Sequence, residues 1–313
     1  MKVLITEFMD TDALSIFPSD FEVVYEPDLV EQRERLLELV ADFDALIVRN
    51  RTRVDRELLD QGGSLRVIGR LGVGLDNIDL ETCKARSITV IPATGANTLA
   101  VAEYVITALL MMVRGCFFST ADMISGGWPR TQLGQGNEVV GKTLGLLGFG
   151  SIAREVAKRA TALGLKVVAF DPWVCSESFE SLGVVEADLD SLLSQVDILS
   201  LHVPLTDQTH KLVDQEFISA IKPGAYLINT ARGELVDIVA LSDALESGQL
   251  SGAVLDVFES EPLSQNELSL FETCRNLILT PHVAGVTHEA NERVSFMIAT
   301  EVSRFLTGER QNA

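Results

Sequence analysis

A glycine-rich turn between an apolar run and a helical run constrains the fold of this chain more than any other sequence feature. Leu144 to Leu147 is apolar, Gly148 to Ala153 has the pattern GxGxxA, and Arg154 to Leu163 has helical spacing. The glycines permit a tight turn and close approach of a ligand to the backbone, and the alanine allows close packing of helix on strand. Free N–H groups and the helix dipole at such a turn suit phosphate groups. The pattern predicts a dinucleotide pyrophosphate at the edge of a parallel sheet, in contact with Gly148, Gly150, Ser151 and Ile152.

Alternating strands and helices extend in both directions from this turn. Apolar runs predict six strands around it, at residues 143–147, 166–170, 198–202, 225–229, 252–256 and 277–280. With helices between them, these strands predict a doubly wound parallel sheet. The first 97 residues predict a smaller α/β sheet, with strands at 2–6, 45–48, 66–69 and 89–91 and a helix at 29–40.

Two further helices complete the predicted organisation. One runs from residue 100 to about 118, and the other covers 289–306. Because the sheet around the glycine-rich turn is already complete, we expect the second of these helices to return and cover the first sheet. A length of 313 residues exceeds the usual size of a single hydrophobic core, so two domains are expected.

Composition excludes several classes of partner. The net charge of −20 opposes encounter with nucleic acid or an anionic membrane surface. The most apolar window, 99–113, is too short for a bilayer span and contains Glu103. The N-terminus has no signal-peptide pattern, and the four cysteines form no CxxC pair. We therefore expect a cytoplasmic protein without a metal site or a disulfide framework.

An acidic residue after the next strand indicates which dinucleotide is bound. Asp171 follows the apolar run 167–170 and lies 23 positions after Gly148. A carboxylate in this place accepts hydrogen bonds from the adenosine ribose hydroxyls and repels a 2′-phosphate. The expected cofactor is therefore NAD rather than NADP.

Three later segments place charged side chains just after predicted strands. They are 229–233 with Arg232, 261–262 with Glu261, and 281–285 with His282. Open α/β sheets bind their ligands at this edge. Arg232 can hold a carboxylate through a bidentate fork, and His282 can exchange the proton of a hydroxyl group. Glu261, paired with His282, would favour the imidazolium form, which suits a proton donor.

Taken singly, these residues have ordinary structural explanations: Arg232 is typical of a surface ion pair, Glu261 with Pro262 of a loop, and Pro281 with His282 of a capped turn. Their order and spacing instead resemble the D-2-hydroxyacid dehydrogenases. The stretches that carry the resemblance are Gly69–Asp79, Gly148–Ala153, Asn229–Val236, Leu255–Pro262 and Thr280–Gly285. They span nearly the whole chain.

The resemblance implies a fold and a set of roles. It implies two α/β lobes: a flavodoxin-like substrate domain of residues 1–98 with 287–313, and an inserted Rossmann-type, doubly wound NAD-binding domain of residues 99–286. Arg232 would clamp the substrate, Glu261 would partner the histidine, and His282 would be the general acid and base. The remaining cofactor positions would be Val203, Pro204, Thr230, Ala231, Asp256 and Gly285, and the remaining substrate positions Val73, Gly74 and Asn97. Family members are usually dimers through the cofactor lobe, here through 99–112 and 128–130.

Arginines in the first region bear on the substrate. Arg49, Arg51 and Arg53 alternate after the strand 45–48, so their side chains point the same way if the chain stays extended. Arg49 or Arg51, with Arg70, would bind a second anionic group at C3 of the substrate. The alternative is a solvated face of salt bridges with Asp42, Asp44 and Asp55.

Several substrates remain open. The matched loops resemble those of phosphoglycerate dehydrogenases, whose substrate carries a phosphate. Residues 48–52, 91–97 and 284–287 resemble more closely those of bacterial sulfolactate dehydrogenases, whose substrate carries a sulfonate. A glyoxylate or hydroxypyruvate reductase is a further alternative, and an NAD-sensing, corepressor-like binding protein is an alternative of another class. We expect no C-terminal regulatory domain.

Overall fold

A computed structural model describes residues 1–274 and 276–308 of the chain. The chain divides into two compact units. The first contains residues 1–97 and the C-terminal segment that starts at 286, and the second contains residues 98–285. Each unit is built around its own parallel sheet.

The first unit has a five-stranded parallel sheet with the strand order β2-β1-β3-β4-β5. Its strands are β1 (Lys2–Ile5), β2 (Glu22–Tyr25), β3 (Ala45–Val48), β4 (Val67–Arg70) and β5 (Thr89–Pro92). This is the order of flavodoxin-like folds. The central strands are buried over nearly all of their length, as the continuous apolar run of β3 predicts. The expected flavodoxin-like lobe is therefore confirmed.

Helices cover both faces of this sheet. One face packs on α1 (Arg33–Leu39), α2 (Arg56–Gln61) and α3 (Leu80–Ala85), and the other on the 3-10 turn Thr11–Ile16 and the C-terminal helix α13 (His288–Thr307). A Cβ at Gly69 of β4 would lie 2.7 Å from Ile298 and 2.8 Å from Val302 of α13, so the glycine allows the helix to pack closely. The prediction that the C-terminal helix covers the first sheet is confirmed.

The second unit has a seven-stranded parallel sheet with the order β12-β11-β10-β9-β6-β7-β8. The strands are β6 (Thr143–Leu147), β7 (Lys166–Phe170), β8 (Val185–Glu186), β9 (Ile198–Leu201), β10 (Ala225–Asn229), β11 (Leu250–Leu255) and β12 (Leu277–Leu279). The order reverses between β6 and β9, which is the switch point at which doubly wound sheets bind ligands. The expected Rossmann-type sheet is therefore confirmed.

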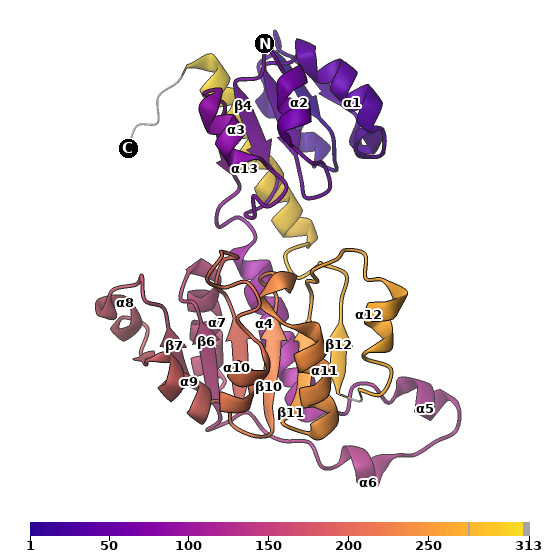
Figure 1. Ribbon diagram of the computed structural model, residues 1–313, viewed down its shortest axis with the longest axis vertical. Coiled ribbons are helices and arrows are strands. Elements are labelled where there is room, and N and C mark those ends of the chain that lie inside the picture. The colour runs from indigo at the N-terminus through magenta and orange to yellow at the C-terminus, as the bar shows by residue number, and fades with distance from the viewer. Residues whose placement is uncertain (275, 309–313) are drawn as a thin grey trace. The chain divides into compact units, whose positions relative to one another are not determined.

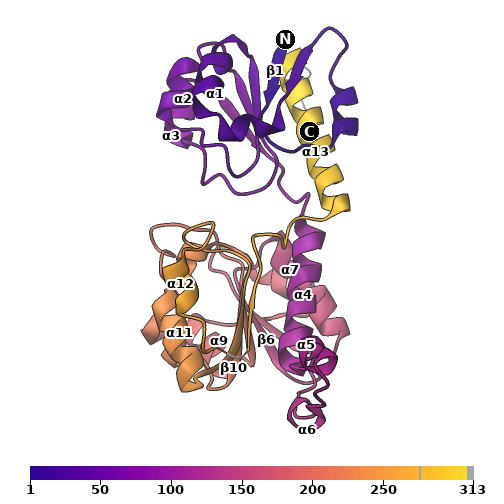
Figure 2. The ribbon, with the colours of Figure 1, turned by 90° about the vertical axis from the view of Figure 1, so that its right-hand side faces the viewer.

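The helices of the second unit form a layer on each side of its sheet (Figures 1 and 2). α4 (Thr98–Arg114) and α7 (Ser151–Ala162) pack together on one face, with α8 (Ser176–Glu180) beside them. α9 (Leu189–Gln195), α10 (Gln215–Ala220) and α11 (Ile238–Ser247) cover the other face. The shorter helices α5 (Thr120–Ile124), α6 (Arg130–Leu133) and α12 (Gln265–Ser269) lie in connecting segments.

Some element boundaries differ from the expectations. The helix predicted at 100–118 ends at Arg114, because Gly115 takes a left-handed conformation with φ 66°. The helix predicted at 29–40 is the shorter α1 between two 3-10 turns. Strands β2 and β8 were not predicted, since β2 is only partly buried and β8 is two exposed residues without an apolar pattern. In the described part of the chain no helix has both the length and the apolar character to cross a membrane.

His202 provides a test of the packing at the end of β9. Its imidazole Nε2 lies 2.9 Å from Ser200 Oγ, and loss of solvent lowers the pKa of His202 from 6.5 to about 4. Between these two pH values His202 is protonated in the unfolded chain but not in the folded chain. Stability therefore falls as the pH drops from 6.5 towards 4. A full shift corresponds to about 3 kcal/mol, and the partial exposure of the residue reduces that amount.

We therefore expect the His202→Gln variant, which keeps a nitrogen near Ser200 but does not titrate, to lose less stability than the wild type between pH 7 and pH 4.5. Urea unfolding at the two pH values measures the difference. Equal losses in both proteins would show that His202 does not contribute.

Candidate active site

The glycine-rich turn is packed against the end of β9. Gly148 has φ 93°, a conformation that favours glycine. A Cβ at this position would lie 2.8 Å from the carbonyl of His202 and 2.9 Å from the backbone nitrogen of Val203. The turn therefore borders the segment that begins Val203-Pro204, two of the positions expected to contact the cofactor.

The N-terminus of α7 is open. Gly150 is its N-cap residue, no side chain caps the helix, and no atom beyond its chain neighbours lies within 4 Å of a Cβ built on Gly150. The N–H groups of Ser151 and Ile152 belong to the first turn, and Ser151 Oγ accepts a hydrogen bond from Thr98 Oγ1 at 3.3 Å. An open helix N-terminus with this geometry suits an anionic group such as a pyrophosphate.

Asp171 is oriented by backbone hydrogen bonds on both sides of its carboxylate. Oδ2 accepts from the N–H of Phe149 at 2.8 Å, and Oδ1 accepts from the N–H of Trp173 at 3.0 Å. The first bond joins the carboxylate to the glycine-rich turn. Each carboxylate oxygen has a second lone pair, so Asp171 can still accept from the hydroxyls of a ribose.

The loop after β10 is held by a buried amide. Asn229 Nδ2 donates to the carbonyl of Arg232 at 2.7 Å, and Asn229 Oδ1 accepts from the N–H of Ala231 at 3.0 Å. Between them, the hydroxyl oxygen of Thr230 is buried with no hydrogen-bond partner in the described residues. A buried polar atom of this kind needs a partner, and the carboxamide or ribose of a nicotinamide nucleotide would provide one.

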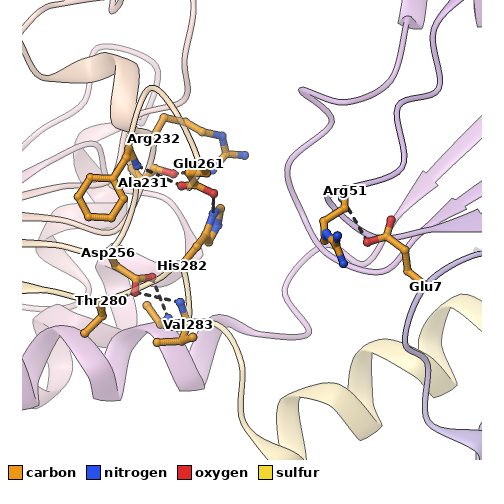
Figure 3. A network of polar contacts seen from close by, with 11 residues as sticks. Glu7, Arg51, Ala231, Arg232, Asp256, Glu261, Thr280, His282 and Val283 are labelled. Atoms are coloured by element: carbon orange, nitrogen blue, oxygen red, sulfur yellow. Dashed lines mark hydrogen bonds and ion pairs between the residues drawn. The ribbon is translucent and has the colours of Figure 1, made fainter. Parts of the chain in front are cut away.

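Two loops that are distant in sequence meet at Gly233. A Cβ on this residue would lie 1.9 Å from the carbonyl carbon of Phe258 and 2.3 Å from the nitrogen of Glu259. Only glycine permits such an approach of two backbones. The contact brings the loop that carries Arg232 against the loop that carries Glu261 (Figure 3).

His282 and Glu261 form a pair. His282 Nδ1 lies 2.8 Å from Glu261 Oε2, with side-chain exposures of 40% and 33%. The second oxygen of Glu261 accepts from the N–H of Phe258 at 3.1 Å, so both ends of the carboxylate are held. Because Glu261 engages Nδ1, the other ring nitrogen of His282 remains for proton exchange.

Asp256 holds the loop on which His282 lies. Its buried carboxylate accepts from Thr280 Oγ1 at 2.6 Å and from the N–H groups of Val283 at 2.9 Å and Ala284 at 2.8 Å. His282 has φ 56°, a left-handed conformation that costs a residue with a Cβ about 1–2 kcal/mol. Hydrogen bonds from both sides of the histidine to one carboxylate offset this cost (Figure 3).

Tyr104 of α4 joins this network, and the sequence reasoning did not select it. Its hydroxyl lies 2.5 Å from Thr280 Oγ1. Burial, with a contribution from the Asp256 charge, raises the pKa of the Tyr104 phenol. A single tyrosine in an apolar helix was the available signal, but it does not identify a partner 176 residues away.

The candidate substrate residues of the first unit follow strands β3, β4 and β5. The chain bends at residues 50–52, so the expectation that Arg49, Arg51 and Arg53 alternate along an extended segment is wrong. Arg51 forms an ion pair with Glu31, and Arg49 is half-buried and donates to Asn291 Oδ1 at 2.7 Å. The salt bridges considered as the alternative differ too, because Asp55 pairs with Arg33.

The other candidates of this unit lie in its remaining loops. A Cβ on Gly72, which has φ 153°, would overlap the Arg70 guanidinium, so that group lies directly against the loop containing Val73 and Gly74. Val73 is 40% exposed. Asn97 Oδ1 is buried without a hydrogen-bond partner in the described residues.

The fold and the second-unit site together define a nicotinamide-dependent dehydrogenase. The sequence model of the D-isomer specific 2-hydroxyacid dehydrogenase NAD-binding domain matches residues 106–284. The chain is 50% identical over 305 residues to the (S)-sulfolactate dehydrogenase of Chromohalobacter salexigens, covering 97% of this chain and 98% of that protein. The chain belongs to the D-isomer specific 2-hydroxyacid dehydrogenases and is an NAD-dependent oxidoreductase.

Other relatives have different named substrates. The hydroxypyruvate reductase of Thermotoga maritima is 36% identical, with 97% of this chain and 98% of that protein covered. The D-3-phosphoglycerate dehydrogenase of Methanocaldococcus jannaschii is 38% identical over 99% of this chain, which spans only 58% of that longer protein.

Solved structures share the fold over the whole chain. The TT0316 protein of Thermus thermophilus matches with a TM-score of 0.90 at 34% identity, covering 100% of this chain and 99% of that one. The NAD-dependent formate dehydrogenase of Staphylococcus aureus, solved in complex with NAD, matches with a TM-score of 0.83 at 27% identity, covering 99% and 97%.

The geometry at Asp171 leads to a prediction about cofactor choice. Asp171→Asn removes the charge that repels a 2′-phosphate and keeps one acceptor for the backbone. We expect the preference for NADH over NADPH in kcat/KM to fall by about tenfold or more, equivalent to about 1.4 kcal/mol. Steady-state kinetics with both cofactors measure this, with exposed Asp190 changed to Asn as the control. An unchanged preference would show that the choice is made elsewhere.

Proposed function

We propose that this dehydrogenase acts on a 2-hydroxy acid with a second anionic group at C3, and that the group is a sulfonate, as in 3-sulfolactate. Sequence identity supports the sulfonate, because the chain is 50% identical to a sulfolactate dehydrogenase and 38% identical to a phosphoglycerate dehydrogenase. In (S)-3-sulfolactate the priority of sulfur inverts the label of a D-like centre, so the name agrees with a D-specific family.

The reaction follows from three side chains. The nicotinamide supplies the hydride acceptor for oxidation at C2 and, when reduced, the hydride donor. His282 takes the proton of the C2 hydroxyl during oxidation and returns it to the carbonyl oxygen during reduction. Glu261 fixes the histidine ring and stabilises its protonated form. Arg232 holds the substrate carboxylate through a bidentate fork.

Other residues would bind the cofactor and the substrate. We propose that residues 99–286 form the NAD-binding domain and residues 1–98 with 287–313 the substrate domain. The cofactor would be held by Gly148, Gly150, Ser151, Ile152, Asp171, Val203, Pro204, Thr230, Ala231, Arg232, Asp256, His282 and Gly285. The substrate carboxylate would receive the N–H groups of Val73 and Gly74, with Asn97 nearby, and the second anion would be met by Arg49, Arg51 and Arg70.

The environment of Arg49 is the observation that supports a second anion. Its half-buried guanidinium donates to the neutral amide of Asn291. A half-buried cation gains most from an anionic partner. The identity to the hydroxypyruvate reductase of Thermotoga maritima favours a second candidate, reduction of hydroxypyruvate or glyoxylate, whose substrates have no second charge.

Loss of NADH absorbance tests these candidates. With 3-sulfopyruvate, 3-phosphohydroxypyruvate, hydroxypyruvate and glyoxylate, we expect kcat/KM to be highest for 3-sulfopyruvate, and at least tenfold above glyoxylate. A preference for hydroxypyruvate or glyoxylate would overturn the proposed substrate. Absence of turnover with all four would favour an NAD-sensing binding protein.

The proton-transfer role of His282 has its own test. In the His282→Ala variant we expect kcat to fall by about a thousandfold or more, because the variant loses the group that takes the hydroxyl proton. The NADH dissociation constant should change far less, because the other cofactor positions are intact. Stopped-flow kinetics and NADH fluorescence titration measure the two quantities. The exposed His210, changed to Ala, is the matched control. Turnover at the wild-type rate in His282→Ala would show that His282 does not take part in proton transfer.

We also propose a cytoplasmic homodimer that associates through the NAD-binding unit. The segment around α5 and α6, which extends from the body of that unit in Figure 1, exposes large apolar side chains: Phe117, Phe118, Ile124 and Trp128. Patches of this kind mark association surfaces. The free thiols of all four cysteines fit a reducing compartment. Light scattering of the purified chain tests the dimer.

A further inference from the structure

Glu7 is a buried carboxylate that the reaction does not use. It follows β1 in the first unit and is 4% exposed. Its Oε1 accepts from the N–H groups of Arg49 at 2.8 Å and Thr52 at 2.9 Å. Its Oε2 accepts from the N–H of Arg51 at 3.1 Å (Figure 3). A carboxylate that receives three backbone donors determines the path of that backbone.

The same bend is held from two further directions. Thr6 Oγ1 lies 2.9 Å from Thr52 Oγ1. Asn77 Nδ2 donates to the carbonyl of Thr52 at 2.7 Å and to that of Arg49 at 3.2 Å. The segment from Arg49 to Thr52 therefore has a defined conformation although it is a loop.

The side chain of Arg49 is positioned by another element. Its guanidinium donates to Asn291 Oδ1 at 2.7 Å, from the first turn of α13. Burial lowers the pKa of the Arg49 guanidinium, and the charge of Glu7 opposes that effect. The group is thus held at both ends, through its backbone by Glu7 and through its guanidinium by Asn291.

Arg49 differs from four other arginines of its unit in the kind of partner it has. Arg33, Arg35, Arg51 and Arg86 of the same unit each form an ion pair with a carboxylate. Arg49 has no carboxylate within ion-pair distance in the part of the chain that the structure describes. A guanidinium has five N–H donors, and the amide of Asn291 accepts from one of them. The remaining donors suit the oxygens of a tetrahedral anion.

We infer that Glu7 and Asn291 are positioning residues that determine specificity for the second anion of the substrate, by holding Arg49 with donors available. The inference rests on the proposed function. A sulfonate and a phosphate share the required chemistry, three oxygens around a tetrahedral centre, so the substrate pair 3-sulfopyruvate and 3-phosphohydroxypyruvate distinguishes them.

Two variants of Asn291 and one of Glu7 test the inference. Asn291→Ala removes the acceptor that orients Arg49, and Asn291→Asp keeps an oxygen there but adds a negative charge that competes with the ligand. Glu7→Gln removes one of the acceptors for the loop. We expect each to raise KM for the preferred dianionic substrate by about tenfold, with kcat within twofold and KM for glyoxylate unchanged. The adjacent, exposed Glu292, changed to Gln, is the control.

Inhibition by inorganic sulfate separates this inference from the proposed substrate. With saturating NADH and glyoxylate as substrate, we expect sulfate to inhibit the wild type, and the inhibition constant to rise about tenfold in Asn291→Asp but not in Glu292→Gln. If glyoxylate is the preferred substrate yet sulfate inhibition depends on Asn291, the proposed substrate is wrong and the anion subsite stands. If sulfate does not inhibit, or inhibits all variants equally, the subsite is overturned.

General damage to the first unit gives a different result. In that case KM would rise equally for glyoxylate and for the dianions, and this outcome would also overturn the inference. Thermal unfolding of each variant shows whether it is folded. The Asn291 variants remain informative if Glu7→Gln does not fold, because Asn291 lies at the partly exposed start of a helix.

Discussion

The carboxylate of Asp256 accepts three hydrogen bonds from the loop that follows β12, and the geometry of His282 depends on them. The histidine lies between Thr280 and Val283, both bound to the same carboxylate, and it has a left-handed backbone conformation. Without that restraint a residue with a Cβ would leave this conformation. Its ring would then lose the hydrogen bond with Glu261. The buried carboxylate of Asp256 therefore orients the pair formed by His282 and Glu261.

Parallel topology explains how the remaining parts of the site come together. The glycine-rich turn follows β6, Asp171 follows β7, Val203 and Pro204 follow β9, the Arg232 loop follows β10 and Asp256 follows β11. The carboxyl ends of parallel strands lie on one edge of a sheet, so residues separated by more than a hundred positions become neighbours. The first unit uses the same arrangement, with Glu7, Arg49 and the loop at Gly72 after β1, β3 and β4.

Electrostatics act in opposite directions at long and short range. A net charge of −20 repels an anionic substrate at a distance, although salt screens this repulsion beyond about 8–10 Å. Directional donors must therefore supply the attraction at short range, and each unit offers its own: the open N-terminus of α7 in the second unit and the guanidinium of Arg49 in the first. The half-buried environment of Arg49 strengthens each hydrogen bond it makes, because the local dielectric is lower than in water.

The sequence by itself determined the two α/β units, the glycine-rich turn, the acidic residue directly after β7 and the order of Arg232, Glu261 and His282. These features depend on local patterns: apolar runs, glycines at turns, and polar residues directly after strands. Only the tertiary structure decided that Arg51 pairs with Glu31, that Glu7 bends the segment from Arg49 to Thr52, and that Tyr104 meets Thr280. Each of these contacts joins residues far apart in the chain, and no local pattern encodes which distant partner a polar group will find.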